Sequence, residues 1–278
     1  MRREADALEE LPRSSSRLSG GTAERITGDV PDASSPDLAL ALELADLADS
    51  ISLPRFRAAD LQVESKADGT PVTDVDRAVE LALRETILRE RPSEEILGEE
   101  EGGDPGPLAW IIDPIDGTKS FSRGFPIWAT LIAFEREGEI ACGVVSAPAL
   151  GHRWWASRGR GAFRGSTPIR VSSTPRLADA SVSAAYARDF AALEPTAWHV
   201  RAVGDFWQHV LVAEGALDAA IDSEHARWDY SALVPIVEEA GGRLSDLDGN
   251  PPRPGQQLVT SNGLVHDELL DLLQTGGR

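Results

Sequence analysis

An apolar run that ends abruptly in an acidic turn constrains the fold of this chain more than any other stretch. Residues 108–112 read LAWII and have the length and composition of a buried strand. The hexapeptide DPIDGT follows at once, in which Pro114 fixes the backbone and Gly117 permits a sharp bend. The sequence therefore predicts a core strand that delivers the carboxylates of Asp113 and Asp116 to its carboxyl end.

Two interpretations of this acidic turn are open. Neighbouring carboxylates at the mouth of an apolar strand repel each other and lose hydration, and a hard divalent cation with oxygen ligands relieves both costs. Asp113 and Asp116 can equally cap the turn or the helix after it. The pattern recurs where residues 96–98 lead to Glu99 and Glu100, although that pair taken alone is more simply a solvated charge cluster.

Strand and helix signals alternate along the rest of the chain, which indicates an α/β protein. Residues 1–34 mix charge with Ser, Gly, Thr and Pro and predict a disordered N-terminal extension. Helices are expected from Pro36, from about Asp74 to before Arg91, over 206–214, from about Asp229 to the Gly241-Gly242 stop, and over 266–272. Strands are expected within 56–63 and at 128–134, 140–147, 153–156, 160–163, 169–172, 181–185, 200–203, 217–221, 243–247 and 258–261.

The bulk properties narrow the class of protein. A chain of 278 residues can bury a substantial core. Its net charge of -19 argues against a nucleic-acid or anionic-membrane partner, because no basic face is offered to phosphate groups. The single cysteine, Cys142, excludes a disulfide framework within the chain, and no apolar stretch has the length of a membrane span. We therefore expect a soluble, cytoplasmic protein.

Four separated pieces carry a resemblance to a known family. They are Gly98-Glu99-Glu100, the DPIDGT turn, Trp228-Asp229 and residues 239–242, which read EAGG. In this order they resemble the inositol monophosphatase family of Mg²⁺-dependent phosphatases over roughly Pro36 to the C-terminus. The resemblance implies a layered α/β/α/β/α sandwich, as in fructose bisphosphatases. It places one phosphatase domain at 35–278, with two closely packed halves at about 35–175 and 176–278, and it implies a homodimer.

The resemblance also implies a metal site. Glu99, Asp113 and the Ile115 carbonyl would hold one Mg²⁺, and Asp113, Asp116 and Asp229 would hold a second. A third, weaker ion would share Glu99. Magnesium fits these residues independently, because they offer oxygen ligands and no His or Cys at ligand spacing.

The same resemblance implies the catalytic roles. Thr118 with Glu99 would orient and deprotonate the attacking water, so that Glu99, Thr118 and Asp116 form the predicted catalytic set. The backbone amides of Gly117 and Thr118 would bind the phosphate of the substrate, a small-molecule ester. The remaining expected neighbours are Lys66, an electrostatic partner of the metals, and Asp76, which would steady their water shell.

The identity of the substrate's alcohol is predicted mainly from residues in the second half of the chain. Segments 128–133, 147–155 and 204–207 look most like the histidinol-phosphatase branch of the family. Asp205 would suit a ligand that bears an ammonium and an imidazole. The resemblance implies that Asp222 takes the position of a glutamate that receives inositol hydroxyls, and Glu224 would add to a negative substrate pocket. Asp205 can also simply N-cap the next helix. The competing functions are hydrolysis of inositol 1-phosphate or of a broader range of sugar phosphates, and a catalytically silent binding or scaffold protein with the same fold.

Overall fold

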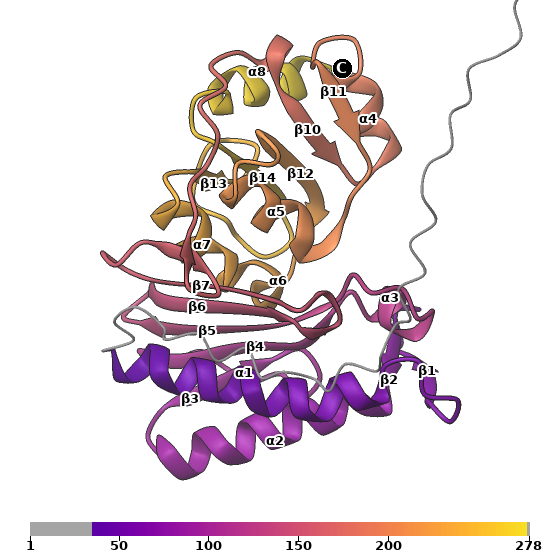
Figure 1. Ribbon diagram of the computed structural model, residues 1–278, viewed down its shortest axis with the longest axis vertical. Helices are drawn as coiled ribbons and strands as arrows, with labels where there is room; N and C mark the ends of the chain where they lie inside the picture. The colour runs from indigo at the N-terminus through magenta and orange to yellow at the C-terminus, as the bar shows by residue number, and fades with distance from the viewer. Residues whose placement is uncertain (1–34, 277–278) are drawn as a thin grey trace, which may run out of the picture.

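The protein is a stack of five layers, in the order helices, sheet, helices, sheet, helices (Figure 1). The computed structural model describes residues 35–276, so the predicted disorder of residues 1–34 lies outside the described residues. The layer order is the predicted α/β/α/β/α sandwich, and the prediction of the fold is confirmed.

The first layer consists of α1 (Pro36–Arg55) and α2 (Asp74–Glu90), which the hairpin of β1 (Val63–Ser65) and β2 (Pro71–Thr73) connects. A proline at its first position opens α1, as predicted. A capping box opens α2, in which the Thr73 and Asp76 side chains each accept from the other's backbone amide. The strand expected within 56–63 lies later in the chain, because strand pairing begins only at Val63.

The second layer is a seven-stranded sheet in the order β3-β4-β5-β6-β7-β8-β9. Its strands are β3 (Glu95–Gly98), β4 (Leu108–Asp116), β5 (Ala129–Arg136), β6 (Glu139–Ala147), β7 (His152–Ser157), β8 (Ala162–Arg164) and β9 (Thr167–Pro168). Only the β3–β4 pair is parallel in this sheet. A 3₁₀ turn, η1 (Pro148–Leu150), joins β6 to β7, and α3 (Thr118–Ser122) follows β4 directly.

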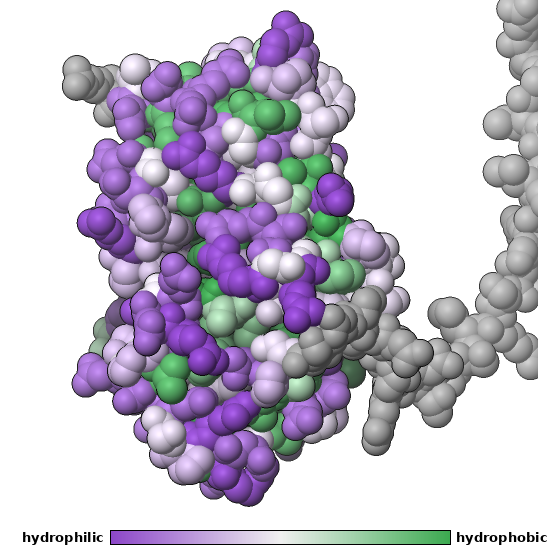
Figure 2. Space-filling view, turned by 90° about the vertical axis from the view of Figure 1, so that its left-hand side faces the viewer, coloured by the Kyte–Doolittle hydropathy of each residue, from purple (hydrophilic) through white to green (hydrophobic). Residues whose placement is uncertain are grey.

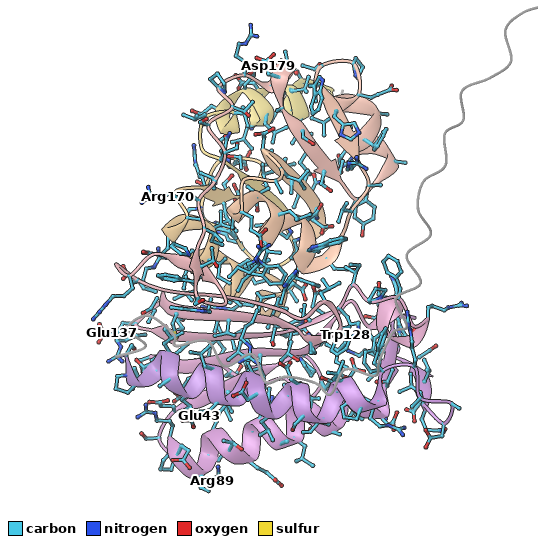
Figure 3. The ribbon with its side chains drawn as sticks, in the orientation of Figure 1. Glu43, Arg89, Trp128, Glu137, Arg170 and Asp179 are labelled. Atoms are coloured by element: carbon cyan, nitrogen blue, oxygen red, sulfur yellow. The ribbon has the colours of Figure 1, made fainter. Side chains whose placement is uncertain are left out.

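Apolar side chains fill the space between this sheet and the first helical layer. The largest are Trp110, Trp128, Phe134 and Trp155, all at most 1% exposed. Trp128 lies within the fold, while Glu43 and Arg89 point outward from the two helices (Figure 3). Burial of these rings stabilises the sheet against α1 and α2 through the hydrophobic effect.

The second half of the chain supplies the other three layers. Its sheet has the order β11-β10-β12-β14-β13, with β10 (Ser181–Ala184), β11 (His199–Arg201), β12 (Ala219–Glu224), β13 (Arg243–Ser245) and β14 (Gln257–Ser261). Between the two sheets lie α5 (Asp205–Ala213), α6 (Arg227–Ser231) and α7 (Leu233–Glu239). On the outer face lie η2 (Leu177–Asp179), α4 (Ala187–Leu193) and α8 (His266–Gly276).

Two further predicted elements differ from the structure, and one helix was not predicted. Residues 169–172 form no strand, because the Val171 amide crosses to the Ala240 carbonyl instead of continuing the sheet. The helix expected from Asp229 is two helices that part at Ala232, and Pro235 lies in the first turn of the second, where proline is tolerated. Helix α4 has no counterpart among the predicted elements.

Hydrophilic residues dominate the face drawn in Figure 2, and its apolar residues form separate small patches. Within residues 35–276, none of the helices has both the length and the apolar character needed to cross a bilayer.

Candidate active site

The predicted acidic turn is an irregular end of strand β4. Pairing with β5 shifts register between Asp113 and Asp116, so the strand continues through the turn instead of ending at Ile112. The hydroxyl of Thr130 in β5 donates to the Pro114 carbonyl at 2.8 Å and fixes the bulge. A strand bulge of this kind turns side chains that would alternate between the two faces toward one side.

Gly117 ends the bulge in a conformation that requires glycine. Its φ is +83°, and an added Cβ would lie 3.0 Å from the Ile127 carbonyl oxygen and 3.3 Å from a carboxylate oxygen of Asp205. Helix α3 begins at the next residue, Thr118, whose hydroxyl lies 2.9 Å from the Ile115 carbonyl oxygen and 3.0 Å from Asp76 Oδ1. The structure therefore brings Thr118 to Asp76, at the start of α2.

The second predicted acid, Glu99, follows strand β3, the parallel neighbour of β4. Lys66 donates to Glu99 Oε1 at 2.7 Å and to Glu100 Oε1 at 2.8 Å, so Glu99 is not a purely solvated charge. Burial raises the pKa of Glu99, and Lys66 opposes that rise. Burial alone would lower the pKa of Lys66, but the hydrogen bonds and charges of Glu100 and Glu99 outweigh it and raise that pKa.

Asp229 completes a compact group of carboxylates. It lies in the first turn of α6, where its Oδ2 accepts from the Ala226 amide at 2.8 Å. One carboxylate oxygen each of Asp113, Asp116 and Asp229 lie within 4.8 Å of one another. Asp113 is 1% exposed, and its Oδ1 has no hydrogen-bond partner among the described residues.

The electrostatics of this group fit a bound cation. Burial raises the pKa of Asp113 well above its usual value, and the charges of Glu99, Asp116 and Asp229 raise it further. Burial also raises the pKa of Asp116 well above its usual value, and the charges of Asp205 and Asp229 raise it further. Buried carboxylates that repel one another, one of them with an unpartnered oxygen, are stabilised when a divalent ion binds their oxygens. The residues present therefore fit Mg²⁺, the ion that the resemblance implies.

The predicted acid Asp205 lies beside this group at the start of α5. It is the first residue of the helix, with Gly204 in the N-cap position, so the N-cap alternative for Asp205 is wrong. Its φ of +56° is unusual for a residue with a side chain. The next amide, of Phe206, donates to Asp116 Oδ2 at 2.6 Å, which ties the helix start to the acidic turn. Burial and the charge of Asp222 raise the pKa of Asp205.

The far wall of the pocket carries Asp222 and two histidines that the sequence analysis missed. Asp222 is 5% exposed in β12, and it accepts from Gln208 Nε2 at 2.6 Å. His209 Nε2 and His225 Nε2 lie 3.9 Å and 3.8 Å from Asp222 Oδ2. His225 stands three residues after Asp222 and four before Asp229, a spacing that could have marked it as a neighbour of both acids. The side chain of Glu224 lies outside the described residues.

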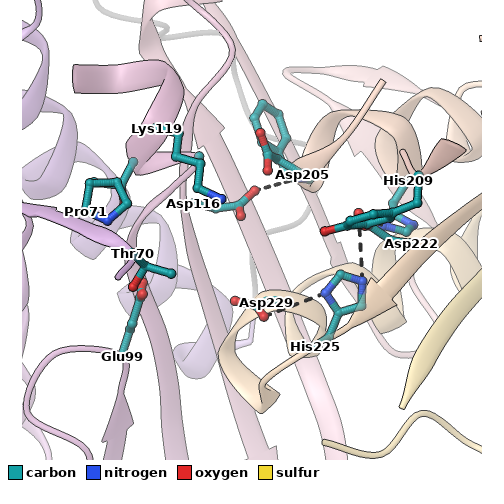
Figure 4. A pocket seen from close by; sticks show the side chains of 14 residues that line it. Thr70, Pro71, Glu99, Asp116, Lys119, Asp205, His209, Asp222, His225 and Asp229 are labelled. Atoms are coloured by element: carbon teal, nitrogen blue, oxygen red, sulfur yellow. Dashed lines mark hydrogen bonds and ion pairs between the residues drawn. The ribbon is translucent and has the colours of Figure 1, made fainter. Parts of the chain in front are cut away.

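Most of these groups line one pocket of about 250 Å³ (Figure 4), while the buried Asp113 is not part of its lining. Glu99 and Thr70 lie on one side, His209, Asp222 and His225 on the other, and Asp116 and Asp229 between them. An oxygen-rich cation site at one end and an imidazole-rich wall at the other suit a small anion that carries a polar group.

A five-layer sandwich with such a carboxylate group beside a glycine turn defines a metal-dependent phosphatase of small molecules. The chain belongs to the inositol monophosphatase family, whose model matches residues 34–276. The predicted family and its enzyme class, the phosphoric monoester hydrolases, are thereby confirmed.

Individual members of the family are similar to this chain over most of its length. A histidinol-phosphatase of Mycobacterium tuberculosis is 51% identical over 86% of this chain and 98% of that protein. A histidinol-phosphatase of Streptomyces coelicolor is 45% identical over 85% of this chain and 96% of that protein. The solved structure of a Thermotoga maritima IMPase is 31% identical, superposes with a TM-score of 0.80, and covers 86% of this chain and 97% of its own.

Proposed function

We propose that this protein hydrolyses histidinol phosphate to histidinol and inorganic phosphate, with Mg²⁺ as its cofactor. The observation that carries the proposal is a single pocket in which Asp116 and Asp229, grouped with the buried Asp113, face Asp222 and two histidines. The two histidinol-phosphatases above support it, because they are similar to this chain over nearly their whole length.

The acidic end of the pocket is the proposed phosphate site. Glu99, Asp113 and the Ile115 carbonyl would hold one Mg²⁺, Asp113, Asp116 and Asp229 a second, and Glu99 would share a third. Such ions neutralise phosphoryl oxygens, lower the pKa of water and stabilise a leaving alkoxide. The residues of the chain position the ester around them.

Positioning and proton transfer fall to the turn that follows β4. The Gly117 and Thr118 amides, at the start of α3, would bind the phosphate oxygens. Thr118 Oγ1 is held between Asp76 and the Ile115 carbonyl, and from there it would orient the water that attacks phosphorus. Burial raises the pKa of Asp76, which makes its carboxylate a better acceptor of a proton passed through Thr118. Glu99 would share this task on the opposite side of the water.

The other end of the pocket is the proposed site for the alcohol. Histidinol bears an ammonium and an imidazole, and both gain from carboxylates that are partly removed from water. Asp205 and Asp222 supply such groups, and Glu224 belongs to the same strand as Asp222. Inositol 1-phosphate is the competing substrate, because hydroxyl groups can also bond these acids. A catalytically silent protein is disfavoured, since every predicted acid of the phosphate end is present and assembled.

Location and assembly complete the proposal. We place the protein in the cytoplasm as a homodimer, on the resemblance of its sequence to the family. Size-exclusion chromatography with light scattering tests the assembly, and a mass of one chain would overturn it.

The decisive experiment is phosphate release by metal-free protein to which Mg²⁺ is returned. Histidinol phosphate, inositol 1-phosphate and fructose 1,6-bisphosphate are assayed in parallel, with Asp116→Asn as the inactive comparison. We expect Mg²⁺-dependent release, fastest from histidinol phosphate, and loss of more than about 100-fold in Asp116→Asn, since deletion of one catalytic electrostatic group costs about 3 kcal/mol or more. Turnover of none of the three esters would refute the enzyme, whereas preference for inositol 1-phosphate would refute only the substrate.

A further inference from the structure

The far wall of the pocket contains a second group of metal-ligating atoms. His209 comes from α5, Asp222 from β12, and His225 from the loop before α6. One atom of each lies within 4.8 Å of the other two, and the two imidazole rings meet edge to face with centroids 6.2 Å apart. Helix α5 and the end of β12 with the loop after it thus converge on one point.

The surroundings hold each ring in an orientation that suits a ligand. His209 Nδ1 lies 2.8 Å from Thr260 Oγ1, which leaves Nε2 directed at Asp222. His225 Nδ1 faces Asp229 Oδ2 at 3.7 Å, and its Nε2 is buried with no hydrogen-bond partner in the described part of the chain. Metal-bound histidines commonly direct the second ring nitrogen at a hydroxyl, carbonyl or carboxylate in this way.

The donor set selects the kind of ion. Two imidazole nitrogens and one carboxylate oxygen match Zn²⁺ and its neighbours, while Mg²⁺ prefers oxygen ligands alone. Tetrahedral ligands at about 2.1 Å from Zn²⁺ lie about 3.4 Å apart. The distances of 3.8 and 3.9 Å to Asp222 Oδ2 are close to that value, and small side-chain rotations would close the difference.

We propose that His209, Asp222 and His225 bind one Zn²⁺-class transition-metal ion, separate from the Mg²⁺ cluster, with its fourth position open to the pocket. All three residues line that pocket together with Asp116 and Asp229 (Figure 4). Because the three ligands occupy the wall, the remaining position faces the space that the substrate enters.

The open position has a specific use if the protein acts on histidinol phosphate, and this step rests on the proposed function. The imidazole of the substrate would displace a water and donate its nitrogen lone pair to the ion, while the phosphate lies at the acidic end. Inositol phosphates have no imidazole and would gain nothing from the ion. The metal would therefore act as a specificity element for one end of the substrate, and His225, which faces both Asp222 and Asp229, would link the two sites.

Co²⁺ spectroscopy tests the site directly, because tetrahedral Co²⁺ absorbs strongly in the visible range whereas octahedral Co²⁺ does so weakly. Metal-free full-length protein is saturated with Mg²⁺ and titrated with Co²⁺, and Zn²⁺ is then added as a competitor. We expect a tetrahedral spectrum at one equivalent that Zn²⁺ abolishes. Asp113→Asn should keep the spectrum, and His225→Gln and His209→Ala should lose it. His152→Ala, an exposed histidine, is the matched control and should keep it.

Addition of histidinol tests the role. It should shift the Co²⁺ spectrum of the wild type, and inositol should not. If Asp113→Asn loses the spectrum and His225→Gln keeps it, the ion binds at the acidic cluster and the proposal is overturned. The absence of any tetrahedral spectrum in the wild type would overturn it as well. His225→Gln is checked by thermal melting, because its ring is less buried than that of His209. Phosphate release with Mg²⁺ alone reports separately on the proposed function.

Discussion

Asp113→Asn should stabilise the metal-free protein and abolish its response to Mg²⁺. The Asp113 carboxylate is buried, with oxygens of Asp116 and Asp229 no more than 4.8 Å away. At an effective dielectric constant of about 20, two unit charges at that distance repel by about 3.5 kcal/mol. Proton uptake relieves part of this repulsion, as the raised pKa values indicate, so we expect a net gain of about 2 kcal/mol at pH 7.5 in EDTA. For a chain of this size that is about 4–8 °C in Tm.

Magnesium should reverse the order of stability. An ion at about 100 times its dissociation constant stabilises the wild type by about 2.7 kcal/mol through binding to the folded state. The variant lacks the shared carboxylate and should gain little. Melting curves in EDTA and in Mg²⁺ give the comparison, with Asp218→Asn as the control. Asp218 is also buried and hydrogen-bonded, but it lies outside the pocket, so its loss should destabilise the protein in both buffers. A variant no more stable than the wild type in EDTA, or equally stabilised by Mg²⁺, would refute the reasoning.

Three further predictions concern single side chains. Asp205→Ala should lower kcat/KM for histidinol phosphate about 10- to 100-fold, the worth of one charged hydrogen bond, but lower it less than about threefold for p-nitrophenyl phosphate; equal losses would assign Asp205 a structural role. Glu80 is 0% exposed and accepts hydrogen bonds from the Glu100 and Glu101 amides at 2.8 and 3.0 Å. Glu80→Gln should therefore raise the Mg²⁺ concentration for half-maximal activity about tenfold. Glu85→Gln, at an exposed position of the same helix, should leave that concentration unchanged. Burial lowers the pKa of His266 to about 4, below its unfolded value of about 6.5, so its contribution to stability is complete above pH 6.5 and lost as pH falls toward 4. Between pH 7.5 and 5 the wild type should therefore lose about 2 kcal/mol more unfolding free energy than His266→Asn in urea titrations, and parallel losses would contradict the shift.

The fold was predictable where local chemistry and burial agree. Pro36 opens α1, the Thr73–Asp76 capping box opens α2, and long apolar runs become β5 and β6. Prediction failed where a tertiary contact overrides the local signal. The apolar residues 169–172 cross between layers instead of joining a sheet, because the Val171 amide bonds the carbonyl of Ala240.

The candidate site was likewise predictable where the signal is local and not where it depends on tertiary contacts. Motifs at strand ends and a helix start identified the acids of the phosphate end. No local pattern revealed that Thr118 contacts Asp76, because that contact joins a turn to the start of a helix earlier in the chain. His209 could not be predicted for a related reason, since only the fold of the second half brings α5 beside β12. His225 did have a local signal, its spacing of three and four residues from Asp222 and Asp229. From the sequence, Glu80 is an ordinary charged residue of a helix, and only the structure shows that it is buried.

Competition between two esters in one tube tests the central claim most directly. Histidinol phosphate and inositol 1-phosphate are mixed in equal amounts with the protein and Mg²⁺, and mass spectrometry follows the loss of both. The ratio of the two rates equals the ratio of their kcat/KM values, whatever the fraction of active protein. We predict that histidinol phosphate disappears at least about 100-fold faster, since two well-placed polar contacts are worth about 3 kcal/mol. Equal rates, or faster loss of inositol 1-phosphate, would contradict the assignment of the far wall to an imidazole.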